Sequence, residues 1–119
     1  MACKATVRHV KDVAVVDLSG RITLGDGSGT VRDTVKDLVR KGHRHVLLNL
    51  KDVSYIDSAG LGELVGSYAT MTNQGGQIKL LNSQAKVRDV LNVTKLYAVF
   101  ENFDDEAAAI RSFAQASSA

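Results

Sequence analysis

An aspartate and a serine stand together where an apolar segment of the chain, residues 53–56, gives way to two glycines, Gly60 and Gly62. Side chains such as those of Asp57 and Ser58 can do three kinds of chemistry. They can cap the start of a helix, serve as base and nucleophile, or, for the hydroxyl, accept a phosphoryl group. The function of this chain therefore depends first on what this junction does.

Ser58 lacks the surroundings of a hydrolytic serine. The nucleophile elbow of α/β-hydrolases reads Gly-x-Ser-x-Gly, and Ile56 occupies the place of its first glycine. In those enzymes the histidine follows the serine, whereas all the histidines here precede it: His9, His43 and His45. No cysteine lies near these histidines, so their spacing predicts no metal site. The residues favour neither serine hydrolysis nor metal binding.

A glycine-rich segment, "GDGSGT" at residues 25–30, invites comparison with phosphate-binding loops. A Walker loop requires a lysine after its last glycine, and none follows Gly29. The dinucleotide fingerprint fails as well, because Thr30 stands where its final glycine belongs. A turn before a helix is therefore the favoured interpretation, and nucleotide binding remains the alternative.

Composition sets the class of protein. The chain has 119 residues, of which 45% are apolar and 24% charged, as expected for one soluble globular domain. Its single cysteine, Cys3, excludes an internal disulfide and fits a reducing compartment. The start lacks a signal-peptide pattern and no apolar run is long enough for a membrane span, so we expect a cytoplasmic protein. A net charge of +2 and only six aromatic residues argue against nucleic-acid binding.

The elements that must position the junction follow from hydrophobic periodicity. Two β-rich segments, residues 4–10 and 12–20, meet at Lys11-Asp12, which predicts an antiparallel hairpin. The later strands are separated by helices, which indicates parallel pairing. These strands are expected at residues 43–50, 77–81 and, as a short last strand, 97–100, with helices before Gly42, before Gln74, after Ser83 and after Asp104.

These elements predict a single α/β domain over residues 1–115, followed by a short flexible tail at 116–119. Its mixed sheet has four or five strands, beginning with the hairpin and continuing in parallel, and is flanked by about four helices. The spacing of Leu61, Leu64 and Val65 predicts that these side chains face the core from the helix after the junction.

At that helix start, Asp57 or Ser58 can accept hydrogen bonds from the free N–H groups of the first turn. A cap does not account for Gly60 and Gly62, which leave room for the backbone of another protein to approach Ser58. A phosphoryl group on Ser58 would lie at the positive end of the helix and add about −1.5 to −2 charge beside Asp57. The junction is thus interpreted as a switchable docking surface.

Residues 48–82, "LNLKDVSYIDSAGLGELVGSYATMTNQGGQIKLLN", resemble the STAS domain of anti-sigma factor antagonists. The resemblance extends over nearly the whole chain and includes the Asp-Ser-x-Gly-Leu-Gly segment that defines the family. It implies a mixed sheet with helices on one side and a non-catalytic function. It also implies that a serine kinase, itself the anti-sigma factor, phosphorylates Ser58 and is bound only by the unmodified protein.

The resemblance further implies partners, cofactors and contact residues. The kinase would supply ATP and Mg²⁺, a phosphatase would reset the switch, and the chain would need no cofactor of its own. The expected partner-binding residues are Thr23, Asp57, Ser58, Ala59, Gly60, Leu61 and Gly62. Two segments depart from the family pattern. Thr23 replaces an acid in the segment Gly20-Arg21-Ile22-Thr23, and Thr94-Lys95-Leu96 replaces Ser-Gly-Leu. A STAS scaffold with an output other than a sigma factor is the alternative.

Overall fold

The computed structural model describes residues 3–23 and 29–117 of the chain. Within them, five strands form one mixed sheet in the order β1-β2-β3-β4-β5. β1 pairs with β2 in an antiparallel hairpin, and every later pairing is parallel, as the sequence predicts. The strands are β1 (Lys4–Val10), β2 (Val13–Ile22), β3 (His45–Ile56), β4 (Gln77–Leu81) and β5 (Asn102–Phe103).

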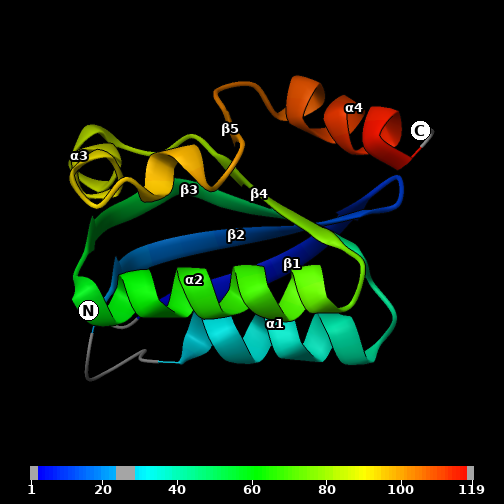
Figure 1. Ribbon diagram of the computed structural model, residues 1–119, viewed down its shortest axis with the longest axis horizontal. Helices are drawn as coiled ribbons and strands as arrows, with labels where there is room; N and C mark the ends of the chain where they lie inside the picture. The colour runs from blue at the N-terminus through cyan, green and yellow to red at the C-terminus, as the bar shows by residue number, and fades with distance from the viewer. Residues whose placement is uncertain (1–2, 24–28, 118–119) are drawn as a thin grey trace.

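In the described part of the chain, four α-helices flank the sheet and cover both of its faces (Figure 1). α1 and α2 lie side by side along one face, while α4 lies on the opposite side of the sheet. The resemblance implied helices on one side only, and the position of α4 corrects that expectation. The helices are α1 (Thr30–Arg40), α2 (Ser58–Asn73), α3 (Ala85–Val93) and α4 (Glu106–Ser117). α4 thus continues two residues into the segment predicted as a tail.

Apolar side chains of the strands point alternately to the two faces of the sheet and form a hydrophobic core on each face. In β2, Ala14 and Val16 point toward α1 and α2, whereas Val13 and Val15 point toward α4. The larger core also takes in buried side chains of α3 and the fully buried Leu64 of α2. The smaller core packs the following residues of α4 against the other face: Ala109, Ile110 and Phe113. Because side chains alternate between faces, the apolar runs of β2 and β3 are buried on both.

Two expectations about individual elements are wrong. Residues 97–100 do not form the last strand, because Leu96–Ala98 is a 3₁₀ turn, η1, and the two-residue strand β5 follows it. Val65 does not face the core: its side chain is 41% exposed, whereas Leu61 and Leu64 are buried as predicted. The apolar sequence of α2 extends around the helix, so periodicity alone did not separate its buried face from its exposed one.

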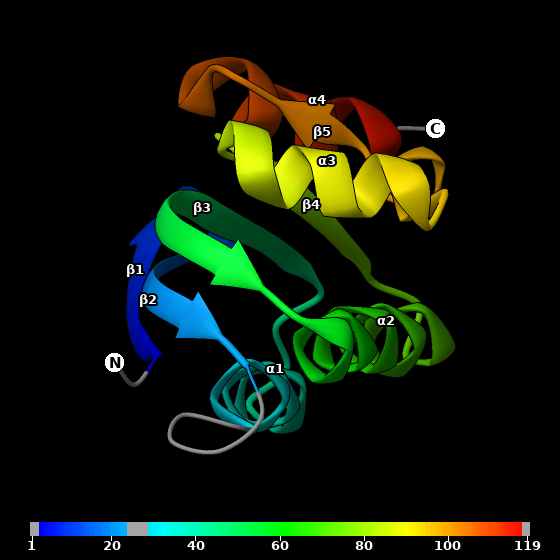
Figure 2. The same ribbon diagram turned by 90° about the vertical axis from the view of Figure 1, so that its left-hand side faces the viewer.

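Parallel pairing of β2 and β3 brings two distant segments to the same edge of the sheet. Ile22 at the end of β2 is in register with Ile56 at the end of β3. Figure 2 shows the two arrowheads side by side, with β3 continuing directly into α2. Thr23 and Asp57, the residues that follow these strand ends, are therefore neighbours. The fold places the predicted junction where parallel strands of α/β proteins present their functional loops.

A charged bridge fixes α4 to the hairpin. The guanidinium of Arg8 on β1 donates two hydrogen bonds to Asp17 of β2, at 2.6 and 3.1 Å. Its remaining donors reach both carboxylate oxygens of Glu106 on α4, at 3.0 and 2.5 Å. Asn49 of β3 adds a hydrogen bond of 2.7 Å to Asp17. The Arg8 guanidinium, through these bonds, holds the pKa of both carboxyl groups below their usual range.

None of the helices in the described part of the chain is both long and apolar enough to cross a membrane.

Candidate functional site at the start of α2

Asp57 is the residue that caps α2. It has extended backbone angles, and its Oδ1 accepts a hydrogen bond of 2.9 Å from the backbone N–H of Gly60. Its own N–H donates to the carbonyl of Ile22 at 3.3 Å, and its carbonyl accepts from Leu61 at 2.9 Å. Asp57 therefore connects the end of β2 to the first turn of α2, in the manner of helix-capping aspartates.

Ser58 is the first residue of α2 and is exposed to solvent. The sequence left open whether Asp57 or Ser58 makes the cap, and the structure assigns that bond to Asp57. The hydroxyl of Ser58 is thus presented at the helix start without serving as the cap. A chemical change at this oxygen can alter the surface while the cap hydrogen bond stays in place.

The two glycines of the junction have different roles. A β-carbon on Gly60 would lie 2.0 Å from the carbonyl oxygen of Ile22 and 2.7 Å from the side chain of Ile56. Gly60 is therefore required by packing inside the domain, and the expectation that it leaves room for a partner is corrected. A β-carbon on Gly62 would meet nothing within 4 Å. Gly62 is exposed, so only this glycine keeps the surface beside Ser58 open.

The structure brings together all the residues predicted to bind a partner, but they are not equally accessible. Ser58 and Gly62 are exposed, and the following are half-buried: Thr23, Asp57 and Ala59. Gly60 and Leu61 are buried and support the site from within. The part of all seven in binding remains a prediction.

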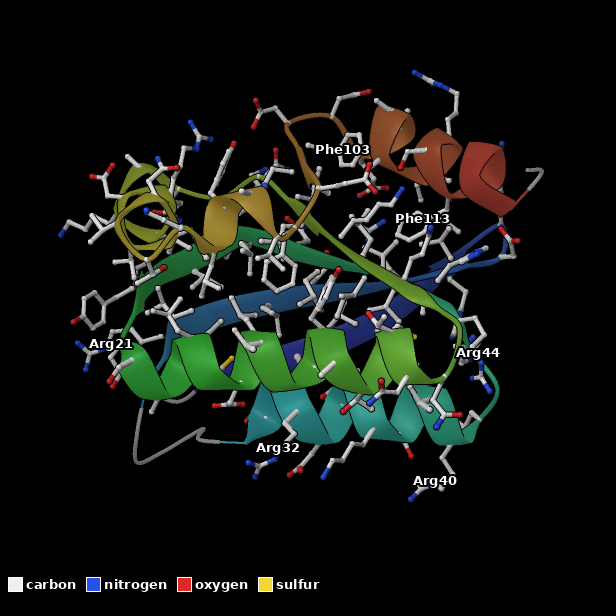
Figure 3. All side chains as sticks on the ribbon, in the orientation of Figure 1. Arg21, Arg32, Arg40, Arg44, Phe103 and Phe113 are labelled. Carbon is white, nitrogen blue, oxygen red and sulfur yellow. The ribbon has the colours of Figure 1, made fainter. Side chains whose placement is uncertain are left out.

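Sequence reasoning missed two exposed residues beside the junction. Arg21 and Tyr55 are cross-strand neighbours in the register of β2 and β3, and each lies close before the end of its strand. Tyr55 is 45% exposed, and Arg21 is exposed with its side chain at the same end of the molecule as the start of α2 (Figure 3). Each of these residues comes one position before the last residue of its strand. If β2 and β3 are assumed to pair in parallel with their ends aligned, this spacing predicts that Arg21 and Tyr55 are neighbours.

The electrostatics of the site favour an anion on Ser58 in one respect and oppose it in another. The first turn of α2 contains no acidic residue, so the positive end of the helix dipole is offset only by the capping Asp57. A phosphate on Ser58 would gain from that dipole and would be repelled by Asp57. The surface potential would therefore change strongly while the helix start remained stable.

The described residues place no histidine near Ser58. All three histidines line a cavity at the other end of the sheet, where β3 begins. Within residues 3–23 and 29–117, no group of three or more metal-ligating side chains has suitable geometry for an ion. The glycine-rich segment lies outside the described residues except for Gly29 and Thr30, so nucleotide binding through it remains an untested alternative.

Gly29 is the residue before α1, with a φ of 89° and no side-chain cap hydrogen bond. A carboxylate from α2 serves this helix start instead. Oε1 of Glu63 accepts a hydrogen bond of 3.4 Å from the backbone N–H of Arg32, and the Glu63 side chain is buried. The second turn of α2 is thereby connected to the first turn of α1.

The sequence profile of the STAS domain matches residues 4–109 of the chain. Two relatives extend over most of it. The anti-sigma F factor antagonist of Paenibacillus polymyxa is 27% identical over 92% of this chain and 94% of its own length. The anti-sigma-B factor antagonist of Bacillus subtilis is 31% identical over 85% of this chain and 91% of its own length.

The fold is also similar to that of solved structures. The Bacillus cell fate determinant SpoIIAA in its phosphorylated form superimposes with a TM-score of 0.69 at 20% identity. The alignment covers 92% of this chain and 99% of SpoIIAA. At that identity the likeness concerns the fold, and it agrees with the profile match over residues 4–109. The chain belongs to the STAS domain family.

Proposed function

We propose that this chain is an anti-sigma factor antagonist that changes partners through phosphorylation of Ser58. In its unmodified form it binds an anti-sigma factor that is also a serine kinase, and so releases a sigma factor for transcription. Phosphorylation ends that association, and a phosphatase restores the unmodified form. Two relatives of nearly the same length are named as antagonists of anti-sigma factors, which supports this function. The switch would operate in the cytoplasm, where sigma factors meet RNA polymerase.

The observation that carries the proposal is the exposed position of Ser58 at the start of α2, beside a cap made by another residue. Partner and kinase can reach the hydroxyl without unfolding the helix. The domain itself does not have to supply a base, a metal ion or a nucleotide. This fits the STAS family of antagonists, whose members are generally non-catalytic.

The group transfer takes place in the partner's active site. The Oγ of Ser58 attacks the γ-phosphorus of ATP, an Oγ–P bond forms, and the bond from that phosphorus to the β-phosphate oxygen breaks. ADP leaves, and the hydroxyl proton passes to a base of the kinase. ATP and Mg²⁺ are bound by the kinase, so the antagonist contributes only the acceptor and the surface that positions it.

The new phosphate changes the contact surface more than the fold. It adds about −1.5 to −2 charge next to Asp57 and beside the open surface at Gly62. A partner surface matched to a neutral hydroxyl would then have to bury an unpaired charge, which costs about 2–5 kcal/mol of affinity. The positive end of the α2 dipole would stabilise the phosphate on the free protein. Both effects favour dissociation.

The test uses the purified chain and a purified anti-sigma factor of the serine-kinase type from the same organism. Ser58→Ala should bind the kinase at least as tightly as the wild type, both with and without Mg-ATP. Ser58→Asp should bind about 30-fold or more weakly, as expected for a loss of 2 kcal/mol or more. Ser54→Ala is the matched control, since it removes an exposed serine hydroxyl four residues away and should leave the switch intact.

Phosphosite mapping after incubation with Mg-ATP decides the site. Phosphate on Ser54, Ser67 or Thr23 with Ser58 unmodified would contradict the assignment. Equal binding of wild type, Ser58→Ala and Ser58→Asp would contradict the switch and favour a scaffold that acts without modification.

A further inference from the structure

A second polar site lies at the end of the molecule opposite Ser58. A cavity of about 390 Å³ opens there between the β1–β2 turn and the segment joining α1 to β3. Figure 3 shows Arg44 at this end, with Arg21 at the end that carries the start of α2. The residues around the cavity are His9, Lys11, Asp12, Gly42, His43, Arg44 and His45. All the histidines of the chain are among them.

The charges around this cavity are mostly of one sign. Lys11 and Arg44 carry fixed positive charges, and the three imidazoles offer further N–H donors. The single acid, Asp12, is close to His45, with Oδ2 at 3.7 Å from Nδ1. The acid is thus partly engaged by a neighbouring base, and the cavity as a whole favours an anionic ligand.

Arg44 is held in position by bonds that use only part of its guanidinium. Its Nη1 donates to the carbonyl of His43 at 3.0 Å and to that of Val39 at 3.2 Å. The described contacts leave the Nε–H and Nη2–H donors uncommitted, and these form the fork that binds an oxyanion through two hydrogen bonds. The bond to Val39 also offsets the negative end of α1, which would otherwise repel an anion.

Two backbone N–H groups beside the cavity are already engaged. The N–H of Gly42 donates to Val39 and that of His43 to Leu38, as in a helix C-terminal turn. At this segment an anion would therefore be bound by side chains. The rings of His9 and His43 are stacked with centroids 4.9 Å apart and an interplanar angle of 28°. Stacking joins β1 to the α1–β3 segment and leaves ring-edge nitrogens available as donors.

We propose that this cavity binds a small molecule that carries a phosphate group. The fork of Arg44, the ammonium of Lys11 and the imidazole N–H groups match the several acceptor oxygens of a phosphate better than the two of a carboxylate. The volume is near the lower end of the range of about 300–1,000 Å³ for ligand pockets, which fits a small phosphate compound. The site is separate from Ser58, because the cavity lies at the start of β3 and Ser58 follows the end of that strand.

The test is a titration of the ¹⁵N-labelled chain at pH 7 with inorganic phosphate, with sodium chloride at equal ionic strength and with malonate. Phosphate should cause saturable shifts in the amide signals of Gly42, His43 and His45. Lys11→Gln should weaken phosphate binding about fivefold or more, because it removes a charged donor from the ligand. The control Lys86→Gln removes an equal charge from an exposed position on α3 and should bind as the wild type does.

Shifts that do not saturate, or that chloride reproduces at equal ionic strength, would overturn the site. Equal affinities of Lys11→Gln and Lys86→Gln would overturn the role of the cavity, and equal affinity for malonate would overturn the assignment to phosphate. Arg44→Gln should abolish binding. Because that variant also loses bonds at the end of α1, its spectrum without ligand must first show that the domain is folded.

Discussion

Gly60 packs against the carbonyl of Ile22 so closely that a β-carbon at Gly60 would lie 2.0 Å from the Ile22 oxygen. The same oxygen accepts the N–H of Asp57, so the end of β2 supports both the cap and the first turn of α2. The orientation of Ser58 thus depends on a contact between two segments that are far apart in the sequence.

Gly60→Ala should destabilise the domain by about 1–3 kcal/mol, because the added methyl group must displace backbone rather than a flexible side chain. Gly62→Ala is the matched control. Its added methyl group points into open space, and the better helix propensity of alanine should raise stability by up to about 1 kcal/mol. Urea denaturation of both variants measures these changes. Similar stability changes in the two variants would contradict the packing role of Gly60.

Gly62→Ala should also weaken partner binding while the domain becomes more stable. The physical reason is that the new methyl group lies on the surface beside Ser58, where the partner is proposed to approach. Calorimetry with the anti-sigma factor measures the affinity. Ala69→Ser, a small change at an exposed position further along α2, serves as the control and should leave the affinity within about twofold of the wild type, as expected for a peripheral contact.

Asp57→Ala should cost about 0.5–2 kcal/mol of folding stability, because it removes the side-chain acceptor at the start of α2. Asp57→Asn should retain most of that stability, since the amide oxygen can accept the same bond from Gly60. Ser58→Ala should change the free energy of unfolding by less than about 0.5 kcal/mol, as for an ordinary surface substitution. A larger effect of Ser58→Ala than of Asp57→Ala would show that the cap has been assigned to the wrong residue.

The Arg8 bridge should make stability depend on acid pH. Asp17 and Glu106 have folded-state pKa values below their ordinary values of about 3.9 and 4.3. A carboxyl group whose pKa is lowered by folding binds more protons in the unfolded chain. Its contribution is therefore complete above its unfolded pKa and is lost as the pH falls through the folded one. The contribution of these two carboxyl groups to the free energy of unfolding should be constant from about pH 7 to 5 and should decline below about pH 4.5.

Arg8→Gln tests the origin of that decline. At neutral pH the variant should lose about 0.2–1 kcal/mol for each of the two partly exposed ion pairs. The difference in unfolding free energy between wild type and variant should shrink as the pH is lowered from 5 to 3. A difference that is independent of pH would show that Arg8 contributes through packing of its aliphatic stem instead.

Lys95→Gly should stabilise the domain by about 0.5–1 kcal/mol, since Lys95 has a φ of 65°, in the left-handed region that favours glycine. This residue stands in the Thr94-Lys95-Leu96 segment, where the family pattern has glycine. Lys36→Gly, at an exposed position inside α1, is the control and should lose a similar amount. Thermal unfolding of both variants provides the comparison, and loss of stability in Lys95→Gly would contradict the strain at this position.

The sequence by itself determined most of the elements, the class of fold and the junction that carries Ser58. The alternating apolar residues of β2 and the continuous apolar run of β3 predict which side chains are buried. This works because successive side chains of a strand point to opposite faces, which is a local property of the chain. The Asp-Ser-x-Gly-Leu-Gly segment identified the family for the same reason: its residues are adjacent in the chain. The short strand β5 escaped this reasoning, because two residues carry no measurable period.

Only the tertiary structure decided what individual residues at the junction do. Gly60 and Gly62 cannot be distinguished in the sequence, yet Gly60 packs against β2 and Gly62 faces open space. The reason is that α2 starts against the end of β2, which encloses one side of its first turn. Val65 is exposed for a similar reason, since α1 and the sheet together cover only part of an apolar helix. Arg8 and Glu106 are 98 residues apart, and the three histidines come from separate strands and loops. Such contacts depend on how the elements pack, and local periodicity contains no information about them.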